Sequence, residues 1–437
     1  MKNKNIIIIG AGFTGLTAGY ELSKKGFNVT IIEKSDEVGG LAAAFSINGK
    51  KIERFYHHWF TNDTEVVSLI SELGLDKYIR KHETKTSMFY SNNFFKLSSP
   101  LDLLKFEPLK FLDRLRLGFM TIRARSVKNW KSLENKSASE WLREIGGNEV
   151  YRVIWKPLLK GKFGSFEKKI SAVWFWNKIK LRGSSRNEKG KEELLYLDGS
   201  FARIAEELKE RIISHGSKIL LNKDVRNVIQ KNGYWEIKSN NWNIKADIII
   251  STVALPITAN FIKSWADRKY INELNRIKYI DNICLVMILD RSLSDIYWLN
   301  VNDPNFPFVG IIEHTNFESS LNYGGRHIVY LSKYLEATHK LNKMNLDQLL
   351  DFSIPYIQKM FPDFKRDWIQ EAHLWKAKYS QPIVEKNYSK LIPDYKSPYD
   401  GLYICTMAQI YPEDRGTNYA VREGRKIAEK IYNEFSK

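Results

Sequence analysis

The fold is decided near the start of the chain by residues 5–33, NIIIIGAGFTGLTAGYELSKKGFNVTIIE. The run Ile6–Ile9 is β-branched and apolar, which predicts a buried strand of a parallel sheet. Apolar residues at helical spacing follow and end at Gly26, and a second short strand then ends at Glu33. A strand, a glycine-rich turn, a helix and a second strand in this order predict a Rossmann-like α/β fold with a parallel sheet and helices.

The glycine-rich turn fits the pattern G-x-G-x-x-G. Gly10 allows the tight turn, Gly12 lets a pyrophosphate approach the backbone, and Gly15 lets the helix pack closely on the strand. Glu33 follows Gly15 by 18 residues and can accept hydrogen bonds from ribose hydroxyls. Since every part is in order, we interpret the segment as a dinucleotide-binding unit rather than a simple turn. The predicted cofactor contacts in the turn are Gly10, Gly12, Phe13, Thr14 and Gly15.

Composition is typical of a folded protein. The 437 residues include 43% hydrophobic and 27% charged residues, which excludes wholesale disorder and suits more than one domain. The two cysteines, Cys284 and Cys405, lie in apolar runs, so we expect neither a disulfide framework nor a metal site. No stretch is apolar for long enough to span a bilayer, and we expect a cytoplasmic protein.

The net charge of +18 is concentrated in one segment. Between Lys105 and Lys191 there are 22 Lys and Arg residues against 8 Asp and Glu, so +14 of the total falls there, among five tryptophans. Such a segment can bind nucleic acid, an anionic membrane surface or an anionic ligand. No nucleic-acid module is recognised, so we expect no nucleic acid partner. An anionic small-molecule or lipid-linked substrate is favoured, and peripheral contact with the inner face of a membrane stays open.

Further segments carry a resemblance to a known superfamily. The acidic residue Glu33 is followed by Gly39-Gly40-Leu41, and later segments are LYLDGSF at 195–201 and the strand-turn-helix pattern of 401–432. These resemble the flavoprotein superfamily of amine oxidases, protoporphyrinogen oxidases and phytoene desaturases, in which a paired glycine borders FAD. The resemblance implies FAD as cofactor, in a Rossmann-like FAD-binding domain of the GR2 type with an inserted α+β substrate domain.

The resemblance also implies how the chain is divided. We expect an FAD-binding domain from 1–90, 193–256 and 390–437, a basic and mostly helical substrate or cap region at 91–192, and a substrate domain with an antiparallel sheet at 257–389. Residues 246–253 resemble the strand after a two-stranded insertion. The polar segment 184–191 predicts a loop.

More cofactor contacts follow from the resemblance. The backbone of Val225 is expected at the adenine, and the amino terminus of the closing helix at the flavin carbonyl. Thr406-Met407 replaces the superfamily's usual Gly-Asp, so Glu413 or Asp414 is considered as the substitute acid. The additional residues implied for the cofactor are Lys34, Gly39, Gly40, Leu41, Val225, Glu413, Arg415, Thr417 and Asn418.

The most unusual local sequence is IERFYHHWFTND at 52–63. It resembles the superfamily's segment beside the flavin and the histidine segment of UDP-galactopyranose mutases, in which the histidine matching His58 lies against the isoalloxazine. His57 stands where the mutases have Pro or Ala. Imidazoles titrate near neutrality, so both are candidate acid/base residues, although either can also be a packing residue.

Two further catalytic candidates lie elsewhere in the chain. Residues 150–182 resemble a helix-and-turn of protoporphyrinogen oxidase-like proteins, and Arg182 is the basic residue expected to face substrate. Tyr411 is expected to line the same cleft.

The leading hypothesis is an FAD-dependent oxidoreductase that transfers hydride from an anionic substrate, such as a sugar nucleotide or isoprenoid-linked precursor of polysaccharide biosynthesis, to flavin. The alternative is a non-redox mutase that uses reduced FAD for sugar ring contraction. A third interpretation is an inactive binding protein with the same fold.

Overall fold

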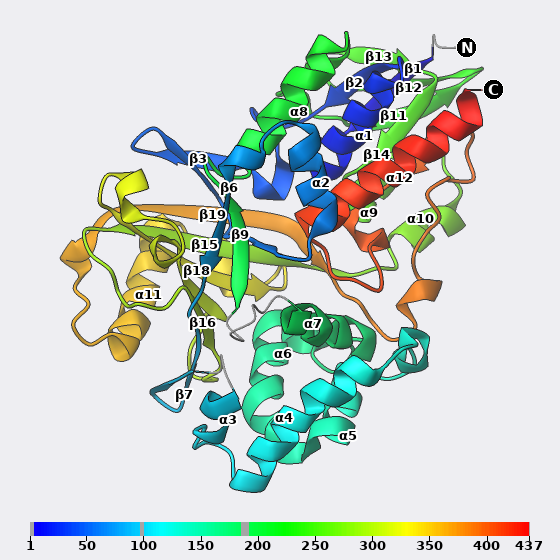
Figure 1. Cartoon of the computed structure of the whole chain (residues 1–437). Helices are drawn as coiled ribbons and strands as arrows, with labels where there is room; N and C mark the ends of the chain where they lie inside the picture. Colours follow the sequence, from blue (N-terminus) through cyan, green and yellow to red (C-terminus); the bar gives the residue numbers. More distant parts are fainter. Residues whose placement is uncertain (1–3, 97–99, 185–191, 437) are drawn as a thin grey trace.

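The computed structural model describes residues 4–96, 100–184 and 192–436. Its first layer is a five-stranded parallel sheet assembled from three distant parts of the chain (Figure 1). In spatial order the strands are β10 (Lys218–Leu220), β2 (Asn28–Ile32), β1 (Asn5–Ile9), β14 (Ile248–Ser251) and β20 (Leu402–Ile404). This sheet, with helices packed on it, confirms the predicted α/β fold class.

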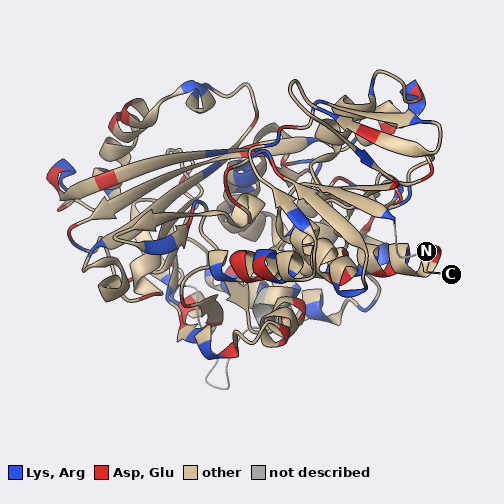
Figure 2. Cartoon of the chain, turned by 90° about the horizontal axis from the view of Figure 1, so that it is seen from above, with Lys and Arg blue, Asp and Glu red and all other residues tan. Residues whose placement is uncertain are grey.

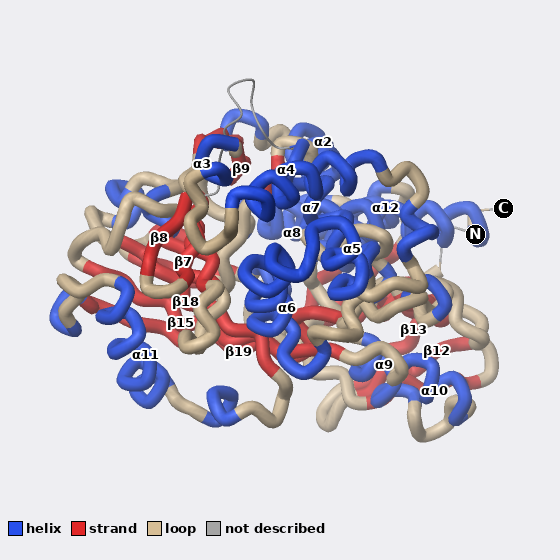
Figure 3. The backbone as a smooth tube through the Cα atoms, turned by 90° about the horizontal axis from the view of Figure 1, so that it is seen from below, coloured by secondary structure: helices blue, strands red, loops and turns tan. Residues whose placement is uncertain are grey.

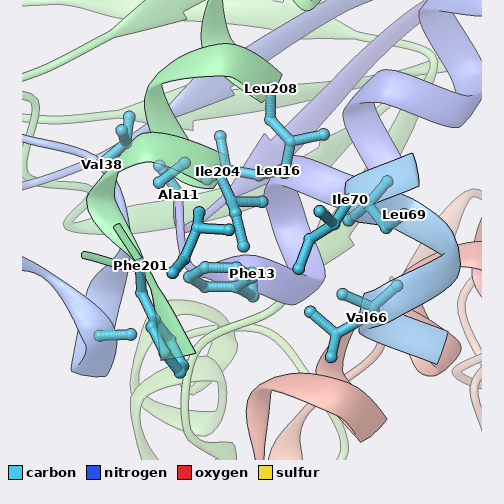
Figure 4. Close-up of a cluster of buried hydrophobic side chains, with 14 of the residues drawn as sticks. Ala11, Phe13, Leu16, Val38, Val66, Leu69, Ile70, Phe201, Ile204 and Leu208 are labelled. Carbon is cyan, nitrogen blue, oxygen red and sulfur yellow. The ribbon is translucent and has the colours of Figure 1, made fainter. Parts of the chain in front are cut away.

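Helices from three parts of the chain pack together beside this sheet. They are α1 (Phe13–Lys24), α2 (Thr64–Glu72), α8 (Ala202–Ser214) and α12 (Thr417–Phe435). Figure 4 shows the apolar cluster that joins α1, α2 and α8, in which Phe13 lies beside Phe201 and Leu16 beside Ile204. All of these side chains are buried, so the N-terminal helix is held by residues that lie far along the sequence.

A second sheet of seven strands forms the other half of the molecule. Its order is β19 (Ile369–Pro382), β15 (Tyr279–Leu289), β18 (His327–Leu335), β17 (Gly310–Glu313), β16 (Trp298–Val301), β7 (Thr86–Tyr90) and β8 (Asn93–Lys96). All its pairings are antiparallel except that of β16 with β7. Figure 2 shows that charged residues lie mainly on helices and loops, whereas the long strands are mostly uncharged.

Helix α11 (Leu346–Met360) packs on β15 and β19 of this sheet.

The basic segment is helical, as expected. Its helices are α3 (Pro100–Leu104), α4 (Phe111–Ser126), α5 (Ala138–Val150), α6 (Lys156–Phe163) and α7 (Ala172–Ser184). A π-helical turn over Tyr151–Trp155 joins α5 to α6. Helices α4–α7 lie together on the face seen in Figure 3. The loop expected at 184–191 falls almost entirely outside the described residues.

Three small sheets connect these parts. They are β3 (Ala44–Ile47) with β4 (Lys50–Glu53), then β5 (Trp59–Phe60), β9 (Glu193–Leu197) and β6 (Ile79–Glu83), and finally β11 (Asn227–Lys231), β12 (Tyr234–Lys238) and β13 (Asn243–Ala246). The last is three-stranded, so the expected two-stranded insertion before β14 was wrong by one strand. Helices α9 (Leu255–Ile262) and α10 (Arg268–Leu274) follow β14.

Candidate active site

The turn between β1 and α1 requires its glycines. Gly10 has a φ of +106°, and a Cβ at Gly15 would lie 2.0 Å from the carbonyl oxygen of Gly10. A Cβ at Gly40, whose φ is +60°, would lie 3.0 Å from the Cα of Gly12. The two glycine segments therefore meet backbone to backbone, and Gly39 donates its N–H to the carbonyl of Ala11 at 2.8 Å. Such a bare cradle fits the approach of a pyrophosphate.

Glu33 lies at the carboxyl end of β2, beside this cradle. Its carboxylate is buried and accepts the N–H groups of Ala11 and Ser35 at 2.8 and 2.9 Å. Each oxygen keeps lone-pair capacity for a further donor, as a ribose hydroxyl would supply. The N–H of Lys223 donates to the Glu33 carbonyl at 2.9 Å, which brings the segment of Val225 next to the predicted ribose site. Val225 is buried, and the Lys34 side chain is exposed.

A cavity of about 360 Å³ lies between the seven-stranded sheet, the helical segment, residues 55–63 and the start of α12. Its lining residues come from four parts of the chain, and among the described residues none of them belongs to 193–256, the middle part of the expected FAD-binding domain. From the N-terminal part these are Leu41, Phe55, Tyr56, His57, His58, Trp59, Phe60 and Asp63. The helical part gives Trp155, Leu158, Lys162, Trp174, Phe175, Lys178, Ile179 and Leu181. The seven-stranded sheet and its loops give Asn282, Trp298, Asn300, Val301, Val309, Gly310, Tyr334, Ala377 and Ser380. The residues at the start of α12 are Asp414, Arg415, Gly416, Thr417, Asn418 and Tyr419.

Both predicted histidines line this cavity, in different settings. The Nδ1 of His57 donates to the carbonyl of Phe55 at 2.5 Å, because a carbonyl can only accept. Burial, together with a smaller effect of the nearby Arg415, lowers the pKa of His57 to about 4, although the hydrogen bond to Phe55 opposes this shift. His57 is therefore neutral near pH 7, with Nε2 as an acceptor. The Nδ1 of His58 lies 2.8 Å from the hydroxyl of Tyr297.

Asp414 is the centre of a charged cluster on the cavity wall. Its carboxylate lies 2.7 Å from Nζ of Lys178 and 3.8 Å from Nζ of Lys162, and accepts a hydrogen bond from Gln381 at 3.1 Å. Although burial opposes ionisation, Lys178 and Lys162 hold the pKa of Asp414 below its usual range. Arg415 donates to the Gln381 side chain and to the Tyr334 hydroxyl, at 3.1 and 2.9 Å.

The start of α12 also lines the cavity, with its backbone N–H groups unpaired within the helix in the first turn. The side chains of Thr417 and Asn418, which were expected near the cofactor at this helix terminus, make hydrogen bonds within the protein. The hydroxyl of Thr417 accepts the indole N–H of Trp59 at 2.6 Å, and the amide oxygen of Asn418 accepts the N–H of Val66 at 3.0 Å. These bonds fix the helix terminus against the N-terminal part, so its positive end is held at the cavity.

Tyr411 and Glu413, which were also predicted site residues, have partners away from the charged cluster. The hydroxyl of Tyr411 donates to Glu134 at 3.0 Å, and Tyr411 is not among the described residues that line the cavity. Glu413 pairs with Arg422 at 3.0 Å rather than with the cavity cluster. Arg182 belongs to α7, but its side chain lies outside the described residues.

Lys178 and Asn282 are among the polar residues of the cavity that were not predicted from the sequence. Lys178 follows Trp174 by four residues, so helical periodicity could have placed both on one face of α7. Asn282 lies within the buried strand β15, and its side-chain amide donates to the Ser332 hydroxyl at 3.0 Å. The position of this polar amide inside an apolar run of the sequence could have indicated its importance. Within the described residues, the amide oxygen of Asn282 and the indole N–H groups of Trp155 and Trp174 have no hydrogen-bond partner.

The glycine cradle and buried Glu33 on a parallel sheet, beside this aromatic and cationic cavity, define a dinucleotide-binding enzyme. The chain belongs to the family of flavin-containing amine oxidoreductases, which matches residues 13–432. Family membership and the dinucleotide motif together confirm the prediction of an FAD cofactor and of membership in a family of FAD-dependent oxidoreductases.

Individual relatives agree with this assignment. The chain is 26% identical over 271 residues to coproporphyrinogen III oxidase of Staphylococcus aureus, an alignment that covers 54% of this chain and 58% of that protein. It therefore spans little more than half the length of that relative. A protein described as a putative protoporphyrinogen oxidase of Exiguobacterium sp. 255-15 has the same fold, with a TM-score of 0.80, 16% identity and coverage of 99% and 100% of the two chains. Reduced UDP-galactopyranose mutase shares the fold at a TM-score of 0.76 and 14% identity, over 100% and 97% of the chains.

Among the described residues, no helix is both long and apolar enough to cross a membrane.

Proposed function

We propose that this FAD-dependent oxidoreductase oxidises an anionic substrate, bearing carboxylate or phosphate groups, in the cavity beside α12. Bound flavin supplies the two-electron acceptor. The observation that carries the proposal is the cationic wall formed by Lys162, Lys178 and Arg415. Its positive charges exceed the opposing charges of Asp414 and Asp63 when both are ionised, and the amino terminus of α12 adds to them.

Hydrogen-bond donors without partners at the cavity also favour an anionic substrate. The indole N–H groups of Trp155 and Trp174 are donors, and neither has a partner within the described residues. A buried donor without a partner costs free energy that an acceptor-rich ligand would recover. Lys162 also lies over the Trp174 ring, with Nζ 4.7 Å from its centroid, so the cation and the indole belong to one recognition surface. A cationic amine would meet like charges here.

The other side chains position the substrate and exclude water. Phe55, Tyr56, Trp298 and Phe175 give the cavity apolar walls. Neutral His57 offers Nε2 as a proton acceptor, and His58 is held by its contact with the buried Tyr297 hydroxyl. We infer that His57 accepts a proton during turnover, while His58 orients the ligand.

The test is anaerobic mixing of the yellow protein with candidate substrates while the visible flavin absorbance is followed. Because a relative is named for oxidation of coproporphyrinogen III, that tetracarboxylate is the first probe and a simple diamine is its cationic counterpart. We expect the anionic compound to bleach the flavin absorbance. Bleaching only with the diamine would refute the anionic assignment. Lys178→Met should raise KM for the anionic probe at least tenfold, whereas the exposed Lys180→Met on the same helix is the matched control.

The non-redox mutase is the second candidate, since the same cationic wall could hold a diphosphate. This candidate requires flavin reduced beforehand and a product at the same oxidation level. Turnover of a UDP-hexose by dithionite-reduced protein, without any substrate oxidation, would favour it over the oxidoreductase.

A further inference from the structure

The strongest unexplained feature is an apolar surface on α3, α4 and the neighbouring strand β8. We call it the α4 patch, and it consists of Phe94, Leu101, Leu104, Phe111, Leu112, Leu115, Phe119 and Ile122. Phe111, Leu112, Phe119 and Ile122 each expose more than 60% of their surface. Elsewhere in the described part of the chain, the exposed large apolar side chains are three scattered residues, Ile213, Leu321 and Tyr432. Contiguous exposed apolar patches mark interaction surfaces.

The spacing of the patch follows helical geometry. At 3.6 residues per turn, the five exposed apolar residues of α4 fall within a stripe about 100° wide. The opposite face of α4 packs into the protein through Leu117, Met120 and Ala124. Helix α4 therefore has two apolar faces, and only the inner one is covered by the described residues.

Basic residues border the outward stripe on both sides. By the same geometry, Arg116 and Arg123 lie along one edge, and Arg114 and Arg125 along the other. Residues 100–126 contain six Lys and Arg against three Asp and Glu. Of the acids, Asp113 is buried and pairs with Arg116 at 2.8 Å. An apolar stripe with arginines along its edges is the pattern of a helix lying in the plane of a membrane surface.

We propose that the α4 patch docks on an anionic membrane surface, with α4 parallel to the bilayer plane. The apolar stripe would enter the boundary between headgroups and acyl chains, while the arginines contact lipid phosphates. Charge distinguishes this occupant from a second copy of the chain, because a symmetric self-contact would place the same basic edges against one another. No described helix is suited to cross a bilayer, which agrees with a surface-bound orientation.

Docking would bring the membrane close to the cavity wall. Helix α4 packs against α7, where the indole N–H of Trp176 donates to the Ala124 carbonyl at 2.8 Å. Other residues of α7, Lys178 and Leu181 among them, line the cavity. One helix therefore separates the proposed membrane contact from the cavity.

The experiment is vesicle flotation of the full chain loaded with FAD. Vesicles of phosphatidylcholine and phosphatidylglycerol in equal amounts are compared with vesicles of phosphatidylcholine alone. We expect binding to the mixed vesicles that is at least tenfold weaker in Phe119→Ser/Ile122→Ser. The matched control, Ile213→Ser/Leu321→Ser, removes exposed apolar residues outside the patch and should bind as the unaltered protein does. Arg123→Gln/Arg125→Gln should weaken binding and reduce its dependence on salt.

Three results would overturn the proposal. The first is failure of the unaltered protein to float with the mixed vesicles. The second is equal flotation of the patch variant and the control. The third is a dimer, seen by sedimentation without lipid, that only the patch variant breaks, because this would assign the surface to a second copy. Equal binding to phosphatidylcholine alone would overturn the requirement for anionic lipid. Unchanged flavin absorbance in each variant shows that the chain has folded.

Discussion

Substitution of Glu33 tests the cofactor site most sharply, because the hydrogen bonds that its carboxylate makes within the protein are known. It accepts two backbone N–H groups, from Ala11 and Ser35, and we predict that it also accepts ribose hydroxyls of FAD. A hydrogen bond to a charged acceptor contributes about 1.5–3 kcal/mol. Loss of one ribose bond in Glu33→Ala should therefore weaken FAD binding by about 10- to 150-fold.

The variants separate this effect from damage to the turn. In Glu33→Gln one side-chain oxygen remains, but the amide N–H₂ must face either Ala11 or Ser35, so one buried N–H loses its acceptor at a cost of about 1–3 kcal/mol. Asp36→Asn, an exposed acid in the same turn, is the matched control.

The assay is FAD titration of the apoprotein by flavin fluorescence, with thermal unfolding of each apoprotein measured in parallel. A folded Glu33→Ala protein that binds FAD with unaltered Kd would refute the ribose role. A loss of affinity in Asp36→Asn as large as in Glu33→Ala would also refute it, since the effect would then be one of general charge.

Three more predictions concern the glycine cradle, a buried acid and the cavity. Gly15→Ala should abolish FAD binding or folding, because the new Cβ has no space beside the Gly10 carbonyl. Gly74→Ala, at a glycine with positive φ and open surroundings, is the control for backbone strain. Retained flavin colour in Gly15→Ala would contradict the steric role of Gly15. Burial raises the pKa of Glu53 to about 7, so the folded protein keeps a proton on this carboxyl that the unfolded chain releases above about pH 4.5. The contribution of Glu53 to the free energy of unfolding should therefore fall by about 3 kcal/mol as the pH rises from about 4.5 to 7. In Glu53→Gln the amide can accept the N–H of Phe201 and donate to the hydroxyl of Tyr196. Denaturant unfolding at about pH 5 and at about pH 8 should therefore show a smaller loss of stability between the two pH values than in the unaltered protein. An equal loss in the two proteins would show that Glu53 is not the titrating group. Asp414→Asn leaves Lys178 and Lys162 without their counter-charge at a cost of about 3–5 kcal/mol, which should appear as a lower denaturation midpoint in the FAD-loaded protein; an unchanged midpoint would show that the cluster is solvated.

The N-terminal unit could be predicted from sequence because its evidence is local. The β-branched strand, the three glycines and Glu33 occur in one continuous segment, and each residue type has a steric or hydrogen-bonding reason to be there. The closing helix α12 was predictable on the same grounds, through its position after a short apolar strand. Those features were enough to define the fold class and cofactor.

The cavity could be predicted only in part, because it is assembled from contacts distant in sequence. Strand β7 pairs in parallel with β16, more than 200 residues away, and nothing in its five residues indicates that partner. The amino terminus of α12, with Thr417 and Asn418, was expected at the flavin, but the hydrogen bonds of their side chains with Trp59 and Val66 could not be predicted from sequence. Lys178 could not be recognised as a site residue from sequence, because its ion pair with Asp414 forms only in the folded chain.

In the proposed function, an anionic compound is oxidised in the cavity beside the FAD site. The most direct measurement is the flavin spectrum of the purified protein, mixed without oxygen with coproporphyrinogen III, and repeated with Lys178→Met and Lys180→Met. We predict bleaching by stoichiometric substrate, slowed at limiting substrate in Lys178→Met and unaltered in Lys180→Met. A flavin spectrum that stays oxidised with this tetracarboxylate but is bleached by a cationic amine would contradict the proposed anionic substrate.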